Sequence, residues 1–114
     1  MIVKFIKSRD PEDGYKIEDL IINREYEVIG IEGNYYRILN NVKEPCLYSP
    51  ECFEILDNSK PKFWVTEVGE DGEEYSYPQS WLGVGFFEDY FDDVKKIVEQ
   101  FHKEYKKYYN KNSS

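Results

Sequence analysis

The 114-residue sequence predicts a β-rich α+β fold. Short runs that alternate apolar and polar side chains, separated by Gly, Pro and Asn turns, fill the first two thirds of the chain, which is typical of strands and hairpins. A stripe of apolar residues at helical spacing then indicates one long amphipathic helix. Aromatic residues make up 18% of the chain, enough apolar area to favour an ordered core over a disordered chain.

The first half is expected to consist of short strands. The first is IVKFIK, followed by the loop-like SRDPEDGYK and by KIEDLIINR, which fits more than one structure. A hairpin over residues 25–40 is indicated by EYEVIGI and YYRIL, which are joined by the turn pair Gly33-Asn34. After a turn at NNVKEP we expect a short strand at CLY, a single helical turn at SPEC and a closing strand at FEIL.

The best linker candidate is DNSKP, which divides the chain into residues 1–57 and residues 58–114, and the two parts are expected to form one compact unit. The second part opens with another hairpin, formed by KFWVTEV and EEYSYP around GEDG. A helix over residues 86–108 is expected next, with Gly85 as its cap, Glu88 in its first turn and its N-terminal half packed on the sheet. The last residues, NKNSS, are expected to fray. The stripe that faces the core consists of Phe87, Phe91, Val94, Val98, Phe101, Tyr105 and Tyr108, widened by Tyr90 and Ile97.

Three segments of the first half carry a family likeness: an acidic loop DPEDGYKIED, a strand and turn in EYEVIGIEGNYYRI, and a closing pattern in CLYSPECFEIL. In this order they resemble a Src-homology-3-like small β-barrel over residues 1–57. Signalling members of that family grip proline-rich peptides with a row of aromatic side chains, and Tyr35 and Tyr48 stand at or near such positions. Cys52 replaces the usual tyrosine of the helical turn, and the first-strand aromatic motif is absent. The resemblance therefore implies a generic interaction platform.

A second likeness lies in the other half. A tryptophan, a glycine pair and then GFFEDYFD are similar to segments of small bacterial immunity proteins that neutralise toxins. The resemblance implies a toxin inhibitor that acts by binding its target.

Charge points toward a protein partner. The formal net charge is −8, which excludes nucleic-acid binding through phosphate neutralisation, because that requires clustered Lys and Arg. Between Glu67 and Asp93 there are nine acidic residues and no basic one, interleaved with aromatics. Such a surface suits a basic protein, with aromatic side chains as anchors. The candidate partner-binding residues are Tyr35, Tyr48, Glu70, Asp71, Glu73, Glu74, Trp81, Phe86, Glu88, Asp89, Asp92 and Asp93.

Other interpretations of the same residues stay open. The carboxylates between Glu88 and Asp93 also complement the positive end of a helix dipole, since lysines follow them further along the helix. Metal binding or catalysis at these carboxylates is a weaker alternative, and no calcium-loop spacing or phosphate-binding motif appears. The single histidine, His102, lacks a nucleophile motif and suits a solvated helix face. We therefore expect no catalytic residue, no metal and no cofactor.

Compartment is inferred from the chain start and the cysteines. MIVKFIKSRD lacks the apolar run of a signal peptide, and no stretch is long enough to cross a bilayer, so a cytoplasmic protein is expected. Cys46 and Cys52 lack metal or redox spacing. They are expected to be reduced and packed as small hydrophobes, with a disulfide as the alternative.

These observations favour a non-enzymatic protein-binding module over an enzyme. The most concrete hypothesis is a small cytoplasmic bacterial immunity protein that occludes a basic toxin through the acidic and aromatic surface. One alternative is a nucleic-acid mimic from a mobile element, which would need carboxylates along an extended face. Another is a structural protein that forms a homodimer through its C-terminal helix instead of remaining a monomer.

Overall fold

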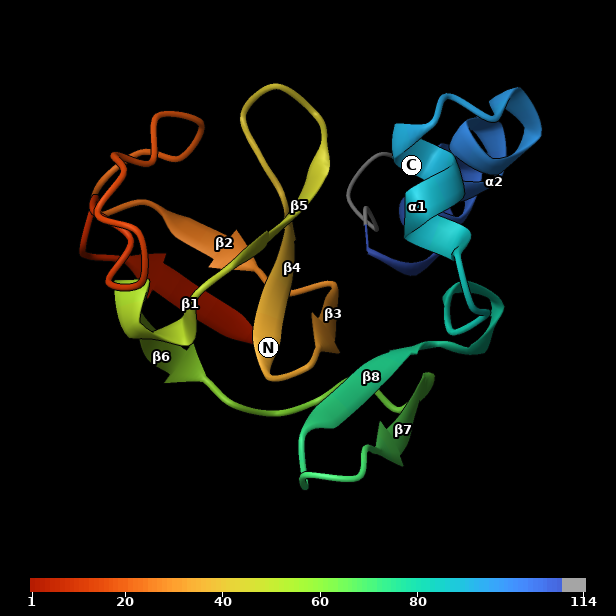
Figure 1. Ribbon diagram of the computed structural model, residues 1–114, viewed down its shortest axis with the longest axis horizontal. Helices are drawn as coiled ribbons and strands as arrows, with labels where there is room; N and C mark the ends of the chain where they lie inside the picture. Colours follow the sequence, from red (N-terminus) through yellow and green to blue (C-terminus); the bar gives the residue numbers. More distant parts are fainter. Residues whose placement is uncertain (110–114) are drawn as a thin grey trace. The chain divides into compact units, whose positions relative to one another are not determined.

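The computed structural model describes residues 1–109, which form an α+β fold of eight strands, two α-helices and two short 3-10 helices (Figure 1). The α+β class is therefore as predicted. The chain divides into two compact units, residues 1–77 and 78–114, so this division falls after the second hairpin, whereas the sequence suggested a boundary at residue 57. The expectation that NKNSS frays lies outside the described residues.

The first unit begins with a three-stranded antiparallel sheet. Its central strand is β1 (Ile2–Phe5), flanked by β2 (Glu25–Glu27) and β6 (Phe53–Asp57) (Figure 1). Val3 and Phe5 of β1 are fully buried, as expected for alternate positions on the face of a strand that covers a core.

A five-stranded sheet follows in the order β5-β4-β3-β8-β7. Its strands are β3 (Gly30–Glu32), β4 (Tyr35–Leu39), β5 (Pro45–Tyr48), β7 (Trp64–Val68) and β8 (Glu74–Pro78). The hairpin turn between β3 and β4 is confirmed at Gly33 and Asn34, where both residues have positive φ. The single helical turn is confirmed as the 3-10 helix Pro50–Cys52, capped by Ser49 Oγ, which accepts from the Glu51 amide.

The predicted closed barrel is wrong, because the segment EYEVIGI does not form one strand. The Val28 amide donates to the Met1 carbonyl, beside the three-stranded sheet, whereas the Ile29 amide donates to the Arg37 carbonyl of β4. The chain thus passes from one sheet to the other between Val28 and Ile29, both of which are buried. The free edge of β3 then pairs with β8, which extends the sheet instead of closing it.

The pairing of β8 with β3 depends on a glycine. A Cβ atom added at Gly30 would lie 2.0 Å from Cε1 of Tyr77, whose side chain is only 2% exposed. Gly30 therefore lets the Tyr77 ring lie directly over the β3 backbone. The second predicted hairpin, β7–β8, is confirmed and belongs to the first unit.

The second unit starts with the 3-10 helix Gln79–Trp81 and contains α1 (Phe86–Phe91) and α2 (Lys95–Tyr108). The predicted cap at Gly85 is confirmed. The single helix predicted over residues 86–108 is wrong, because the chain leaves the helical path at Asp93, which has a φ of 58°. Two hydrogen bonds close α1, one from the Val94 amide to the Asp89 carbonyl and one from the Asp93 amide to the Tyr90 carbonyl. This is the Schellman pattern, with aspartate in place of the usual glycine.

The break changes which stripe residues are buried. Phe87, Tyr90 and Phe101 are buried, as predicted. Trp81, which the sequence suggested as an exposed anchor, contacts the rings of Phe87 and Phe101, and Tyr90 contacts Phe101. Phe91 and Val94, however, are 44% and 36% exposed, so their predicted places in the core are wrong. The helical period that aligned Phe91 with the later stripe residues no longer applies once the chain turns at Asp93.

Candidate functional site

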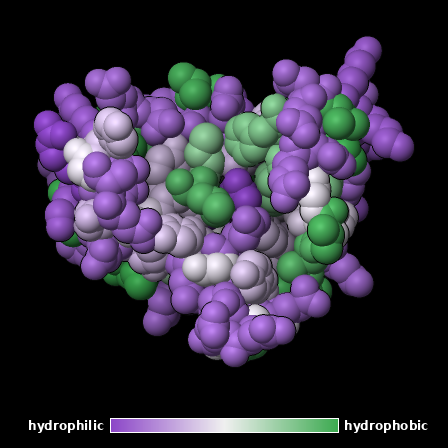
Figure 2. All heavy atoms as spheres, in the orientation of Figure 1, coloured by the Kyte–Doolittle hydropathy of each residue, from purple (hydrophilic) through white to green (hydrophobic). Residues whose placement is uncertain are grey.

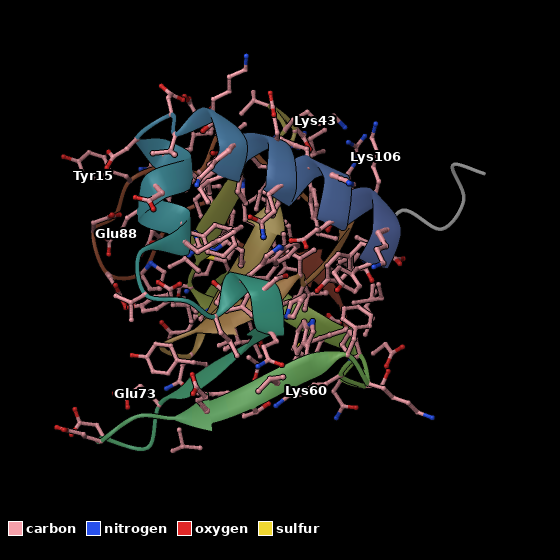
Figure 3. The ribbon with its side chains drawn as sticks, turned by 90° about the vertical axis from the view of Figure 1, so that its right-hand side faces the viewer. Tyr15, Lys43, Lys60, Glu73, Glu88 and Lys106 are labelled. Carbon is pink, nitrogen blue, oxygen red and sulfur yellow. The ribbon has the colours of Figure 1, made fainter. Side chains whose placement is uncertain are left out.

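The acidic residues of the 67–93 window are divided between the two units. Glu70, Asp71 and Glu73 lie at the β7–β8 turn, where the Glu73 carboxylate accepts from the Asp71 amide (Figure 3). Hydrophilic side chains dominate the face of the molecule seen in Figure 2.

Glu74 is already neutralised by a neighbour. Its Oε2 lies 2.7 Å from Lys60 Nζ and also accepts a hydrogen bond from Ser76. Burial alone would raise the pKa of Glu74, but the hydrogen bonds from Lys60 and Ser76 and the charge of Lys60 outweigh it, so the pKa is lowered. Glu74 is therefore an ionised and paired carboxylate, which makes it a poor contact for a basic partner.

Four other carboxylates lie in and after α1, those of Glu88, Asp89, Asp92 and Asp93. Glu88 points outward from the helix (Figure 3). All four are exposed, and within residues 1–109 none of their side chains makes a hydrogen bond or an ion pair. Three exposed apolar side chains, Val84, Phe91 and Val94, lie in the same segment. Glu88, Phe91 and Asp92 share one side of the helix because they are three and four residues apart. We call this set the α1 acidic surface; it consists of Val84, Glu88, Asp89, Phe91, Asp92, Asp93 and Val94.

The aromatic anchors expected from sequence do not lie on this surface. Trp81 is 1% exposed and Phe86 is 8% exposed, and their rings stack with centroids 6.3 Å apart. Both side chains form the core of the second unit, so neither can serve as an exposed anchor. Phe91 is instead the aromatic side chain that is exposed on this surface. Sequence analysis missed it because its spacing matches the buried stripe. The signal that could have found it is the pair Asp92-Asp93, since aspartate is one of the few residues besides glycine that occasionally adopt the left-handed conformation that ends a helix.

The two tyrosines suggested by the barrel likeness already have hydrogen-bond partners. Tyr35 donates its hydroxyl to the Glu12 carboxylate, and this bond, with some burial, raises its pKa. Tyr48 is buried and donates to Asp19 Oδ1 over 2.8 Å, while it accepts from Asn40 Nδ2 over 3.2 Å. Burial is the largest cause of the raised pKa of Tyr48. Neither hydroxyl is available to a ligand without breaking these contacts.

A buried polar network that sequence analysis did not assign lies in the first unit. Arg37 is 4% exposed and donates from Nε to the Tyr77 hydroxyl, from Nη1 to the Pro45 carbonyl and from Nη2 to Glu32 Oε1, each over 2.8–2.9 Å. Tyr77 donates in turn to the same Glu32 oxygen over 3.0 Å. Burial raises the pKa of Tyr77, which keeps its hydroxyl protonated. Because each guanidinium nitrogen of Arg37 and the Tyr77 hydroxyl donates to a protein acceptor, this arrangement ties β3, β4, β5 and β8 together and is structural.

The polar contacts of α2 are likewise structural. The Nε2 atom of His102 lies 2.9 Å from the Tyr90 hydroxyl, and burial, with the nearby charge of Lys106, lowers the pKa of His102. Glu104 Oε1 accepts hydrogen bonds from Trp81 Nε1 and from Ser80 and Gln100. These bonds fasten α2 to the segment that precedes α1.

The cysteines and the acidic side chains of the described part show no metal site. Cys46 and Cys52 are free thiols, and burial is the largest cause of the raised pKa of each. Among residues 1–109, no group of three or more His, Cys, Asp and Glu side chains is placed to hold a metal ion. In the same range, neither helix has the length and apolar character needed to cross a membrane.

The α1 acidic surface is thus the strongest candidate site. It combines unpaired charge with exposed apolar side chains, whereas the polar groups of the Arg37 network and of α2 are already satisfied within the fold. Comparison with protein-family models, with curated protein sequences and with solved structures finds no match for this chain.

Proposed function

We propose that this chain is a non-enzymatic protein-binding module that occludes a basic partner through the α1 acidic surface. The observation that carries the proposal is the exposure of four carboxylates without ion pairs beside the exposed side chain of Phe91. Unpaired negative charge attracts a basic surface and speeds encounter, while a central aromatic side chain supplies buried apolar area. The net charge of −8 acts in the same direction.

The class of partner that we propose is a basic toxin or nuclease, which makes the chain an immunity protein that acts in the cytoplasm. Support comes from the likeness of GFFEDYFD to segments of bacterial immunity proteins, since this run carries most of the α1 acidic surface. The Src-homology-3-like order of elements in the first 57 residues is compatible with a protein that presents surfaces to partners.

Oligomerisation through the C-terminal helix is less favoured. That alternative needs Tyr105 and Tyr108 to protrude from the rest of the chain. Tyr108 instead meets Trp81 edge-on with centroids 6.4 Å apart, and Tyr105 stacks on Phe101 at 6.1 Å. The aromatic side of α2 is therefore used inside the second unit.

The proposal is tested by reversing two charges, Glu88→Lys with Asp92→Lys, and measuring the affinity for a partner captured from the source cell. Both residues are exposed, so folding should be retained. Titration calorimetry at low salt should show a loss of affinity of about tenfold or more, because two attractive contacts become repulsive. Wild-type binding should weaken as salt rises from about 0.05 M to about 0.3 M, since exposed charges are screened.

The matched control is Glu18→Lys with Glu51→Lys, which changes the net charge equally, from −8 to −4, at exposed positions of the first unit. This variant should keep at least most of the affinity. Equal losses in the two double variants would show that only net charge matters, and an unchanged affinity for the first variant would refute the α1 acidic surface as the site.

A further inference from the structure

Strand β7 has one free edge. It is the last strand of the five-stranded sheet, with β8 on one side and no strand of the described chain paired to the other (Figure 1). All four residues after Trp64 in this strand are exposed, so neither face of the strand is covered there. A row of backbone donors and acceptors at strand spacing is matched by another extended polypeptide strand.

The other three edge strands of the described sheets carry features that discourage such pairing. β2 has only three residues, β5 begins with Pro45, which has no amide donor, and the pairing of β6 with β1 contains an irregularity. β7 has neither proline nor lysine, and its five residues make it as long as any described strand. Its free edge is therefore the one most open to a further strand.

The turn between β7 and β8 determines which backbone groups face this edge. The Gly69 amide donates to the Glu73 carbonyl over 2.8 Å. Hydrogen-bonded and non-hydrogen-bonded positions alternate along an antiparallel pair, so Thr66 and Val68 direct their N–H and C=O groups outward, away from β8. Thr66 and Ser76 face each other with 2.8 Å between their side-chain oxygens, as this register requires.

β7 is complementary to a second copy of itself. When a two-fold axis passes beside Thr66, two antiparallel β7 strands bring their Thr66 residues together, and each amide donates to the other carbonyl. The same register sets each Val68 amide against a carbonyl near the start of the other strand. Beyond the strand ends, Lys62 of one copy lies near Glu70 of the other. Both side chains are exposed, and within residues 1–109 neither makes an ion pair.

We propose that two copies of this chain pair through the free edges of β7, which joins two five-stranded sheets into one. The interface consists of a few backbone hydrogen bonds and two symmetric contacts between Lys62 and Glu70. It buries little area, so the dimer is weak and reversible. β7 belongs to the first unit and the α1 acidic surface to the second, so the two surfaces can be tested independently.

Sedimentation equilibrium of the full chain tests the proposal, at concentrations from about 10 µM to about 1 mM. We expect the mean mass to rise toward that of two chains, with a dissociation constant of about 0.1 mM. A chain that remains a monomer at about 1 mM overturns the proposal.

A matched pair of variants at Thr66 tests the backbone contact. Thr66→Pro removes an amide that faces outward, so it leaves the bonds between β7 and β8 in place and should abolish dimerisation. Thr66→Ala also loses the side-chain contact with Ser76 but keeps the amide, so it should dimerise as the wild type does. Equal dimerisation of the two variants would overturn the proposal.

Charge changes test the register without altering the backbone. Lys62→Glu and Glu70→Lys should each weaken dimerisation about tenfold, because each turns two attractive contacts into repulsive ones. The double variant restores opposite charges and should dimerise as the wild type does. Net charge alone would make the single variants act in opposite directions, since the first makes the chain more negative and the second less negative. That outcome, or a double variant as weak as the single ones, would contradict pairing through β7.

Discussion

Replacing Trp81 with alanine is expected to lower the free energy of unfolding of the second unit by about 3–5 kcal/mol. Trp81 is 1% exposed, and its indole Nε1 donates to Glu104 over 3.0 Å. Its ring contacts five other aromatic rings, those of Phe86, Phe87, Phe101, Tyr108 and Tyr109. Alanine would leave a cavity at the centre of this cluster and would remove one partner of Glu104.

This loss is a large share of the total stability, since small domains are stable by only about 5–15 kcal/mol. Urea denaturation followed by near-ultraviolet circular dichroism measures it, since the aromatic signal of the second unit reports the packing of these rings. Trp81→Phe is the control: it keeps one ring and loses the indole hydrogen bond, so the loss should be about 1–2 kcal/mol. If Trp81→Ala and Trp81→Phe both lowered the urea midpoint by the same small amount, Trp81 would not be the centre of the core.

Replacing Arg37 with methionine is expected to cost about 2–3 kcal/mol, because the buried Pro45 carbonyl and the Tyr77 hydroxyl lose the donor that Arg37 supplies, whereas the Glu32 carboxylate is 39% exposed and can be solvated. The Arg37 guanidinium bridges Glu32, Pro45 and Tyr77, and methionine reproduces only its apolar length. Urea denaturation at neutral pH measures the loss.

Two further variants separate the ion pair from simple packing. Arg37→Lys retains the charge but cannot make three directed bonds at once, so it should also destabilise. Combining Arg37→Met with Glu32→Gln should cost less than the sum of the single changes, because the uncompensated carboxylate is gone. If Arg37→Lys left the free energy of unfolding unchanged, the network would contribute little to stability. The same would follow if the losses from Arg37→Met and Glu32→Gln added strictly in the double variant.

Local signals in the sequence were sufficient to predict the turns and the short elements. The pair Gly33-Asn34 supplies two positive φ angles, and Ser49 with Pro50 starts a helical turn, so each element follows from a few adjacent residues. Long-range pairing is different. Gly30, next to Val28 and Ile29, marks an irregularity in the strand pattern but does not indicate that the chain changes sheet, because the change also depends on the pairing of β3 with β8, more than forty residues further along the chain.

The candidate site was predictable in its charges but not in its anchor. Glu88 and Asp92 are exposed carboxylates, as acidic side chains on a helix surface usually are. Phe91 and Phe87 looked equivalent in the sequence, since both fit the helical stripe. Asp93 makes them different by adopting a left-handed conformation, which only a minority of aspartates adopt. Periodicity alone therefore assigned a surface residue to the core.

The most direct test of the proposed binding surface is the partner affinity of Phe91→Ala. Because Phe91 is 44% exposed, this change should leave the free energy of unfolding within about 1 kcal/mol of the wild type. Val68→Ala, at a 71% exposed position of the first unit, serves as the control and should leave affinity unchanged. If Phe91 is the aromatic anchor, Phe91→Ala should weaken partner binding about 30-fold; an affinity equal to that of the wild type would contradict a binding site at the α1 acidic surface.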